Sequence, residues 1–295
     1  MKRFILLSLT LFCLKYSHAQ DSATASVTMM QDSATVHVNE ESLVKNKGRV
    51  VYTTKFKTDG PIIIAGVGLT YLGVTLIQNK KPLTAAQVAA KSKSDLPFFD
   101  RNSAGWYSKQ ANDDSYTPFY ISFAAPLAMV LISKNERTKA GQVLVMYTET
   151  MAIAGTLFTM AAGLVQRSRP LVYGNKASMD LRMSEKSQRS FFAGHTSSSA
   201  AATFFAAKVF QDLNPDSKAK PYVWVIAAAI PASVGYLRYK AGMHFLSDNV
   251  LGYAIGAATG ILVPQFHKNK KLKANFSLSP AVGNDYQGFS LAYHF

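Results

Sequence analysis

Five polar residues of the chain have the side chains that phosphoryl transfer requires, and they lie in order beside apolar segments: Arg169, His195, Arg238, His244 and Asp248. Arginine binds phosphate oxygens through a planar fork of N–H donors. Two histidines can divide the remaining work between a nucleophile and a general acid and base. Asp248 follows His244 by four residues, so on a helix the carboxylate would share a face with the imidazole and hold its tautomer.

Backbone features at the same points support this interpretation. Pro170 is expected to end a helix and to leave Arg169 in its last turn. Gly194 permits a close backbone approach just before a predicted helix, whose free N–H groups can bind an anion. Taken singly, an Arg-Pro pair, a Gly-His pair and a His/Asp pair are more often structural than catalytic. Their ordered combination is what predicts a phosphate site.

These segments resemble the signature of the type 2 phosphatidic acid phosphatase (PAP2) superfamily, which includes bacterial acid phosphatases and vanadium haloperoxidases. The family pattern is Lys-x6-Arg-Pro, then Pro-Ser-Gly-His, then Ser-Arg-x5-His-x3-Asp. The corresponding segments here are Ala162-x6-Arg169-Pro170, Phe192-Ala193-Gly194-His195 and Leu237-Arg238-x5-His244-x3-Asp248. The resemblance covers about residues 60–266 and implies an all-α fold, a six-helix bundle embedded in a membrane.

The resemblance also implies a role for each catalytic residue. His244 would attack phosphorus and form a phosphohistidine, and Asp248 would orient and polarise that histidine. His195 would protonate the leaving oxygen and then activate water for the second step.

The phosphoryl group itself would be bound by Arg169 and Arg238, which match the charge that develops during transfer. The backbone N–H of Gly194 would add one more donor. The family needs no metal or other cofactor for hydrolysis, and the sequence shows no pattern of metal ligands.

Two residues depart from the family pattern. Ala162 stands where the family has lysine, and Ala193 stands where it has the serine before Gly-His. Losing one preorganised donor to transition-state charge costs about 3–4 kcal/mol, or ~10²–10³ in rate. Residues that could replace the missing groups are Arg167, Lys176, Arg182, Lys186, Arg189 and Thr196.

The elements that must position these residues are predicted from apolar runs. Six runs suit helices by their length and by their content of Ala, Leu, Met and Gly. They are 61–77, 117–133, 141–165, 191–210, 222–239 and 245–266. Some of the runs are short for a membrane span, so a soluble all-α bundle is the alternative. Glu149 interrupts the third run and is expected to face the interior of the bundle.

Both ends of the chain differ from this domain. Residues 1–19 read as a signal peptide, with a short signal anchor as the alternative, and residues 20–59 read as a polar tether. Cleavage would remove the single Cys13 and lower the net charge from +15 to +12. Residues 267–295 form a basic hinge and a predicted β-hairpin. The hairpin resembles the last strands of outer-membrane barrels, but packing on the helical body is favoured.

The sequence therefore predicts a phosphatase of the bacterial envelope that cleaves a phosphomonoester or a pyrophosphate, with its site facing the periplasm. The expected partners are a membrane and a phosphorylated lipid, such as an isoprenyl pyrophosphate, a phosphatidic-type lipid or a lipid A phosphate. The surplus of positive charge suits an anionic lipid surface and gives no particular indication of nucleic acid. The alternatives are a soluble exported acid phosphatase on small phosphate esters and a weakened, phosphate-binding envelope protein.

Overall fold

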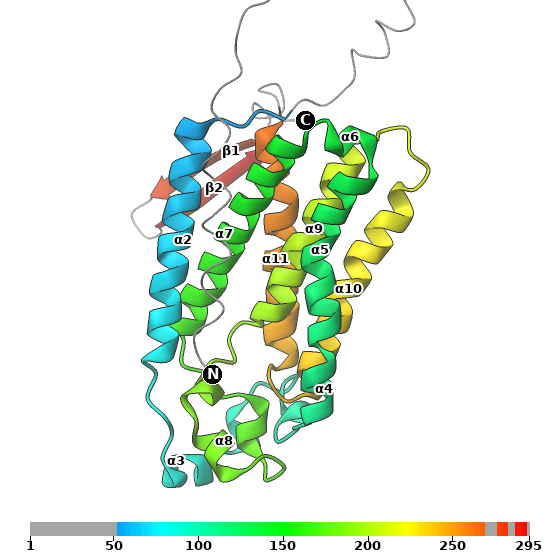
Figure 1. Cartoon of the computed structure of the whole chain (residues 1–295). Coiled ribbons are helices and arrows are strands. Elements are labelled where there is room, and N and C mark those ends of the chain that lie inside the picture. Colours follow the sequence, from blue (N-terminus) through cyan, green and yellow to red (C-terminus); the bar gives the residue numbers. More distant parts are fainter. Residues whose placement is uncertain (1–51, 269–275, 283–286, 294–295) are drawn as a thin grey trace, which may run out of the picture. The chain divides into compact units, whose positions relative to one another are not determined.

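The computed structural model describes residues 52–268, 276–282 and 287–293. The predicted signal peptide and most of the predicted tether lie outside these residues. The long helices run side by side (Figure 1). They are α2 (Phe56–Gln78), α5 (Tyr116–Ile132), α7 (Ala140–Leu164), α9 (Gly194–Leu213), α10 (Lys220–Lys240) and α11 (Leu246–His267). Each of the six apolar runs coincides with one of them to within a few residues.

Short elements connect the long helices. They are α3 (Ala85–Ala89), α4 (Lys109–Asp114), α6 (Lys134–Arg137), α8 (Met179–Met183) and four 3₁₀ turns at Lys93–Asp95, Arg101–Ser103, Pro170–Tyr173 and Glu185–Gln188. Helices α3, α4 and α8 gather at the end of the bundle where α9 and α11 begin (Figure 1). This end therefore carries the loops that surround the predicted site residues.

The helical body begins earlier than the predicted boundary at residue 60. Helix α2 starts at Phe56, and the Asp59 carboxylate in its first turn accepts the backbone N–H of Lys55, the N-cap residue, at 2.7 Å. Tyr52 is buried, and its hydroxyl donates to Asp212 Oδ2 at 2.8 Å. Residues 52–59 thus belong to the body and not to a tether.

Glycine allows α9 and α11 to pack almost backbone to backbone. Gly252, Gly256 and Gly260 repeat every four residues along α11 and face α9. A Cβ at Gly256 would lie 2.0 Å from the carbonyl oxygen of Ser197, a distance that no side chain could tolerate. This contact fixes the first turns of the two helices against each other, and those turns carry His195 and Asp248.

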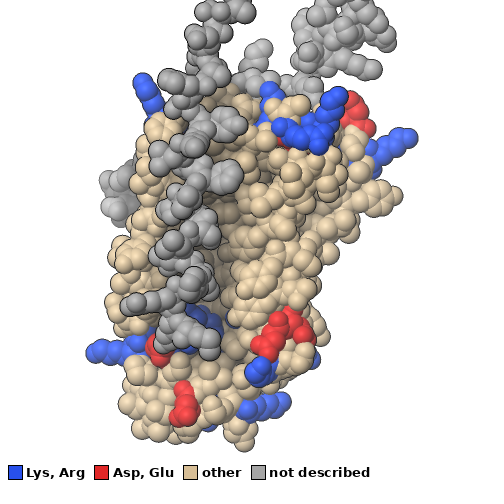
Figure 2. All heavy atoms as spheres, viewed as in Figure 1, with Lys and Arg blue, Asp and Glu red and all other residues tan. Residues whose placement is uncertain are grey.

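Within the described residues, four segments are long and apolar enough to cross a membrane: Phe56–Gln78, Lys109–Ile132, Ala140–Leu164 and Leu246–His267. Large apolar side chains such as Ile64, Tyr71 and Ile132 are exposed on them. On the face that Figure 2 shows, charged side chains gather toward the two ends and leave a largely uncharged band between them. Such a surface supports membrane association. Glu149 is 5 % exposed, which confirms the prediction that it faces the interior.

The C-terminal segment contains two strands, β1 (Phe276–Val282) and β2 (Gln287–Tyr293). They pair in antiparallel register, with Phe276 opposite Tyr293. The residues between the strands and the basic residues before them lie outside the described residues. The predicted hairpin turn and its packing on the helical body therefore stay predictions.

Candidate active site

The site lies at the end of the bundle where α7 and α10 end and where α9 and α11 begin (Figure 1). A tight turn after α10 delivers His244 to it. Gly242 adopts a φ of 70° in this turn, and a Cβ there would lie 1.8 Å from the carbonyl oxygen of Trp106. Glycine is therefore required by the backbone conformation and by the neighbouring chain.

His244 is 2 % exposed, and its Nδ1 lies 2.6 Å from the carbonyl oxygen of Ser190. A carbonyl only accepts hydrogen bonds, so Nδ1 must carry the proton and Nε2 keeps a free lone pair. Burial lowers the pKa of His244, and the positive charges of Arg169 and Arg238 lower it further. The imidazole is thus held neutral in the tautomer that a nucleophile needs.

Asp248 does not contact His244 in the way that the spacing predicted. Helix α11 begins at Leu246 after the N-cap residue Phe245, so His244 precedes the helix and the i, i+4 rule does not apply. The Asp248 carboxylate instead accepts the Ser190 hydroxyl at 2.6 Å and the Phe245 N–H at 3.0 Å. Its link to His244 therefore runs through Ser190, whose carbonyl holds the imidazole.

His195 is the second residue of α9, and its ring packs on Phe119 with centroids 4.5 Å apart. Burial lowers the pKa of His195 to about 3, with further contributions from the charges of Arg238, Arg169 and Arg189. These arginines make the surroundings of both histidines strongly positive. An anion bound between the arginines and the histidines would counteract the lowering of the histidine pKa values.

Arg169, Arg189 and Arg238 form a cluster, since the charges of the other two act on Arg169. Burial is the largest cause that lowers the pKa of Arg169, and repulsion from Arg238 and then Arg189 adds to it. The Nε atoms of all three are buried and have no hydrogen-bond partner within the described part of the chain. Buried donors are normally paired, so three unpaired ones in one place are suited to an anion.

The structure distinguishes among the residues that could replace the family's lysine and serine, which are Ala162 and Ala193 here. Arg167 binds Asp100 and Asp248, and Arg182 donates to the carbonyl oxygen of Val172. Lys176 and Lys186 are exposed, and Thr196 donates to Asn249. Arg189 alone among these candidates joins the arginine cluster. Its backbone is fixed by a bridge to Arg167, because Arg167 N–H donates to Gln188 and Ser190 N–H donates to Arg167.

Arg189 is the site residue that the motif pattern missed. It lies outside the three motifs, and the sequence places it among several equivalent loop cations. The signal that could have identified it is its position directly before the segment that leads into Gly194-His195.

Gly194 is the first residue of α9, where backbone N–H groups lack partners within the helix. A Cβ at Gly194 would lie 2.4 Å from the Phe158 ring, so any other residue would have to displace that ring. Ala193 is the N-cap residue and provides no side-chain cap. Ala162, the other departure from the family pattern, is fully buried in α7.

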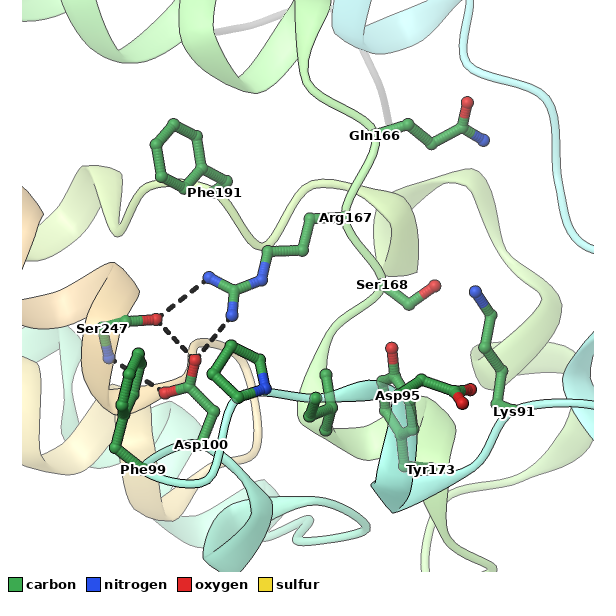
Figure 3. Close-up of a pocket in the computed structure, with 12 residues that line it drawn as sticks. Lys91, Asp95, Phe99, Asp100, Gln166, Arg167, Ser168, Tyr173, Phe191 and Ser247 are labelled. Carbon is green, nitrogen blue, oxygen red and sulfur yellow. Dashed lines mark hydrogen bonds and ion pairs between the residues drawn. The ribbon is translucent and has the colours of Figure 1, made fainter.

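A cavity of about 500 Å³ lies beside this site and is lined by Arg167, Asp100, Ser247, Phe191 and other residues. Figure 3 shows the Arg167 guanidinium directed at Asp100 and Ser247. Arg167 Nη2 lies 2.6 Å from Asp100 Oδ2, and Ser247 Oγ donates to the same oxygen at 2.7 Å. Because its donors are paired, Arg167 supports Asp248 and does not offer a free cation.

The chain is similar to a known protein family and to a solved structure. Residues 143–272 match the family profile described as PAP2 superfamily. Among solved structures, the chain is similar to "the first transmembrane PAP2 type phosphatidylglycerolphosphate phosphatase from Bacillus subtilis", with 20 % identity and a TM-score of 0.42. The match covers 68 % of this chain and 94 % of that one. No curated protein matches the chain. The matched residues 143–272 contain all three motif segments that resemble the PAP2 signature.

Proposed function

We propose that the chain is a phosphatase that removes a phosphoryl group from a lipid ester or anhydride through a phosphohistidine intermediate. The observation that carries this proposal is the arginine cluster, Arg169, Arg189 and Arg238, beside His195 and His244. Its three buried Nε donors have no partner among the residues that the structure describes. A phosphoryl group would satisfy these donors and neutralise their mutual repulsion.

The first step is attack of His244 Nε2 on phosphorus, which forms the N–P bond as the bond to the leaving oxygen breaks. His195 gives its proton to that oxygen. Although burial and, after it, the arginine charges hold His195 neutral in the free protein, a bound phosphate raises its pKa and lets it take up a proton with the substrate. The Gly194 N–H and the arginine cluster bind the charged phosphoryl oxygens.

In the second step, the neutral His195 takes a proton from water as the water oxygen attacks the phosphohistidine. The N–P bond breaks, inorganic phosphate leaves and His244 returns to its neutral state. Asp248 acts as a positioning residue throughout. It holds the Ser190 hydroxyl and the Phe245 N–H, and so fixes the backbone that orients the His244 ring.

A lipid substrate is supported by an apolar cavity of about 540 Å³ between α9, α10 and α11. Its lining includes Tyr239, Leu246, Val250 and Tyr253, and it reaches Thr196, the residue after His195. An acyl or isoprenyl chain would fit this surface while its phosphate lies between the arginines. The apolar outer face of the bundle argues against the soluble acid phosphatase of the sequence analysis.

The test is phosphate release by the purified protein from phosphatidic acid, an isoprenyl pyrophosphate, a lipid A phosphate and a water-soluble phosphate ester. We expect turnover of at least one lipid and little turnover of the soluble ester. We expect His244→Ala to lower release by about 10⁴-fold or more, because the nucleophile is lost. Equal activity of the variant and the unchanged protein would overturn the mechanism.

Ala162 and Ala193 favour a second candidate, a protein that binds phosphate without turning it over. Vanadate binding with no phosphate release from any of these substrates would favour it. We further propose that the site faces the periplasm of a bacterial envelope. Labelling of Asn175→Cys and Lys240→Cys by an impermeant thiol reagent in intact cells is expected, and labelling only after cell lysis would overturn this orientation.

A further inference from the structure

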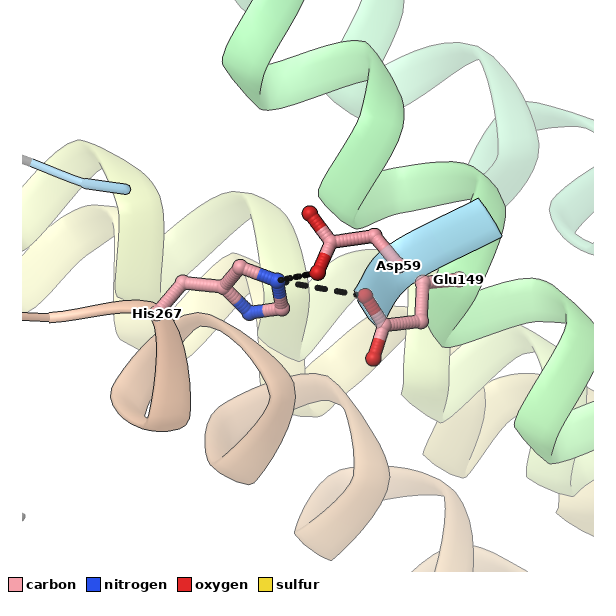
Figure 4. A group of neighbouring side chains, drawn as sticks. All are labelled: Asp59, Glu149 and His267. Carbon is pink, nitrogen blue, oxygen red and sulfur yellow. Dashed lines mark ion pairs between the residues drawn. The ribbon is translucent and has the colours of Figure 1, made fainter. Parts of the chain in front are cut away.

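A second cluster of chemically active side chains lies at the opposite end of the bundle from the arginine cluster (Figures 1 and 4). Asp59 from α2, Glu149 from α7 and His267 from α11 point toward one another. Their exposed fractions are 6 %, 5 % and 9 %. The sequence analysis found no metal-ligand pattern because these three residues are far apart along the chain and meet only in the folded bundle.

The spacing of their polar atoms matches a metal site. His267 Nε2 lies 3.2 Å from Glu149 Oε2 and 3.5 Å from Asp59 Oδ1. All three potential ligand atoms lie within 4.8 Å of one another. Bonds of ~2.0–2.2 Å around a tetrahedral zinc ion place neighbouring ligand atoms about 3.4 Å apart. A cation could therefore be bound after only a small adjustment of the side chains.

The orientation of His267 also fits a metal ligand. Its Nδ1 lies 2.8 Å from the carbonyl oxygen of Val263, so Nδ1 must donate its proton there. In a metal-bound state the ring is neutral, and the lone pair of Nε2 points into the space that it shares with the two carboxylates. Without a metal, a protonated Nε2 would donate to those carboxylates instead. A histidine whose other nitrogen donates to a backbone carbonyl is the usual arrangement around a protein-bound metal.

Glu149 supplies an independent observation. Its side chain is 7 % exposed, and Oε2 receives no hydrogen bond within residues 52–268, the part whose side chains are described. An ionised oxygen buried without a donor is costly. Asp59, in contrast, also accepts the Lys55 N–H and the Thr58 hydroxyl. The unpaired oxygen is thus the one directed at the shared space between the three residues.

We propose that Asp59, Glu149 and His267 bind one divalent transition-metal ion of the zinc type, which ties α2, α7 and α11 together. Two carboxylates and one neutral imidazole balance the charge of such an ion. Water would complete the coordination. The site is structural and separate from the proposed phosphatase chemistry, since it lies at the other end of the same helices.

The test uses the full chain purified without a polyhistidine tag, treated with a chelator and then supplied with Zn²⁺ alone. We expect one zinc per chain to be retained through gel filtration. We also expect the melting temperature to rise by roughly 5 °C or more at 100 times the dissociation constant. Failure to retain zinc, with no shift in melting temperature, would overturn the proposal and leave an imidazolium bridging two carboxylates.

Variants assign the site to these residues. Glu149→Gln and His267→Gln are expected to lose zinc retention. Glu136→Gln, which removes another fully buried carboxylate outside the cluster, is expected to keep it. Cobalt in place of zinc supplies a spectroscopic measurement, because tetrahedral coordination gives intense visible bands. Those bands should vanish in His267→Gln, and their persistence there would overturn the assignment.

Discussion

The two ends of the helical bundle hold buried polar clusters of opposite charge. At one end, Arg169, Arg189 and Arg238 present Nε donors with no partner within the described residues. At the other end, the carboxylates of Asp59 and Glu149 face His267 Nε2 at 3.5 and 3.2 Å, and Glu149 Oε2 has no hydrogen bond within the described residues. Unpaired buried charge is costly, so each end is suited to a ligand of the opposite sign.

A third buried cluster shows that charge alone is not the marker of a site. The carboxylate of Asp212 accepts the Tyr52 hydroxyl at 2.8 Å and pairs with Lys208 Nζ at 2.6 Å. Lys268 pairs with its second oxygen. Every member has a partner, so this cluster closes the end of the bundle and needs no ligand. The useful comparison is therefore between paired and unpaired buried charges.

Arg167→Gln tests the role of a paired buried charge, because Arg167 forms ion pairs with Asp100 and Asp248. It should have the largest effect on stability. It would leave the carboxylates of Asp100 and Asp248, both fully buried, without their cation. We expect the free energy of unfolding to fall by about 3–5 kcal/mol, measured by denaturant titration in detergent. Arg167→Gln combined with Asp100→Asn should recover part of that loss. A fall below ~1 kcal/mol would contradict the supporting role of Arg167.

Arg189→Gln tests the role of a buried charge whose Nε has no partner within the described residues. The substitution removes one cation from the arginine cluster, so kcat/KM for phosphate release should fall by about 10²–10³-fold. The stability of the ligand-free protein should stay unchanged or rise, because repulsion on Arg169 decreases. Lys186→Gln, an exposed cation three residues earlier, is the matched control and should change neither quantity. A destabilised variant with normal activity would show that Arg189 stabilises the fold and does not bind the phosphoryl group.

The sequence predicts the helices well and the site in part. Apolar runs and the position of Gly194 locate helix ends, because these signals are local. The prediction from Pro170 was wrong: α7 ends at Leu164, and Arg169 lies directly before the 3₁₀ turn Pro170–Tyr173 instead of in the last turn of α7. The link between Asp248 and His244 was misread, since a spacing of four residues implies contact only inside a helix and His244 lies before one. Arg189 could not be chosen from several loop cations without the folded backbone.

The cluster of Asp59, Glu149 and His267 could not be predicted from the sequence either, because its members meet only in the folded chain. Glu149 was predicted to face inward because a charge in an apolar helix needs a partner, and this is confirmed. Its partners, however, come from the first turn of α2 and the last turn of α11. Only the packing of α2 and α11 beside α7 brings them together.

The dependence of stability on pH tests the lowered pKa values of the two histidines, which burial causes first and the arginine charges second. The pKa of His195 is lowered to about 3 and that of His244 is also lowered, so both bind protons less readily in the folded state than in the unfolded state. Stability is therefore complete above pH ~6.5 and decreases as the pH falls toward 3, by up to about 1.4 kcal/mol per pH unit for each histidine.

Thermal unfolding between pH 7 and pH 4 measures this slope. His195→Gln should reduce it, and bound vanadate should reduce it further because an anion raises the pKa of both histidines. Identical slopes for the variant and the unchanged protein would show that protonation of His195 does not contribute to the dependence of stability on pH.

Ala193→Ser should have the smallest effect of these substitutions on stability and activity. It changes a residue that lies both at the start of α9 and beside the proposed phosphate site. Ala193 is the N-cap residue of α9 and gives the first turn no side-chain acceptor, while its own N–H donates to the Asp248 carbonyl at 3.0 Å. A serine hydroxyl would cap that turn and raise the free energy of unfolding by about 0.5–2 kcal/mol. If the hydroxyl instead turned toward the arginine cluster, as the family pattern implies, kcat/KM would rise while stability stayed the same. Measuring both quantities on one variant therefore distinguishes a missing cap from a missing phosphate donor.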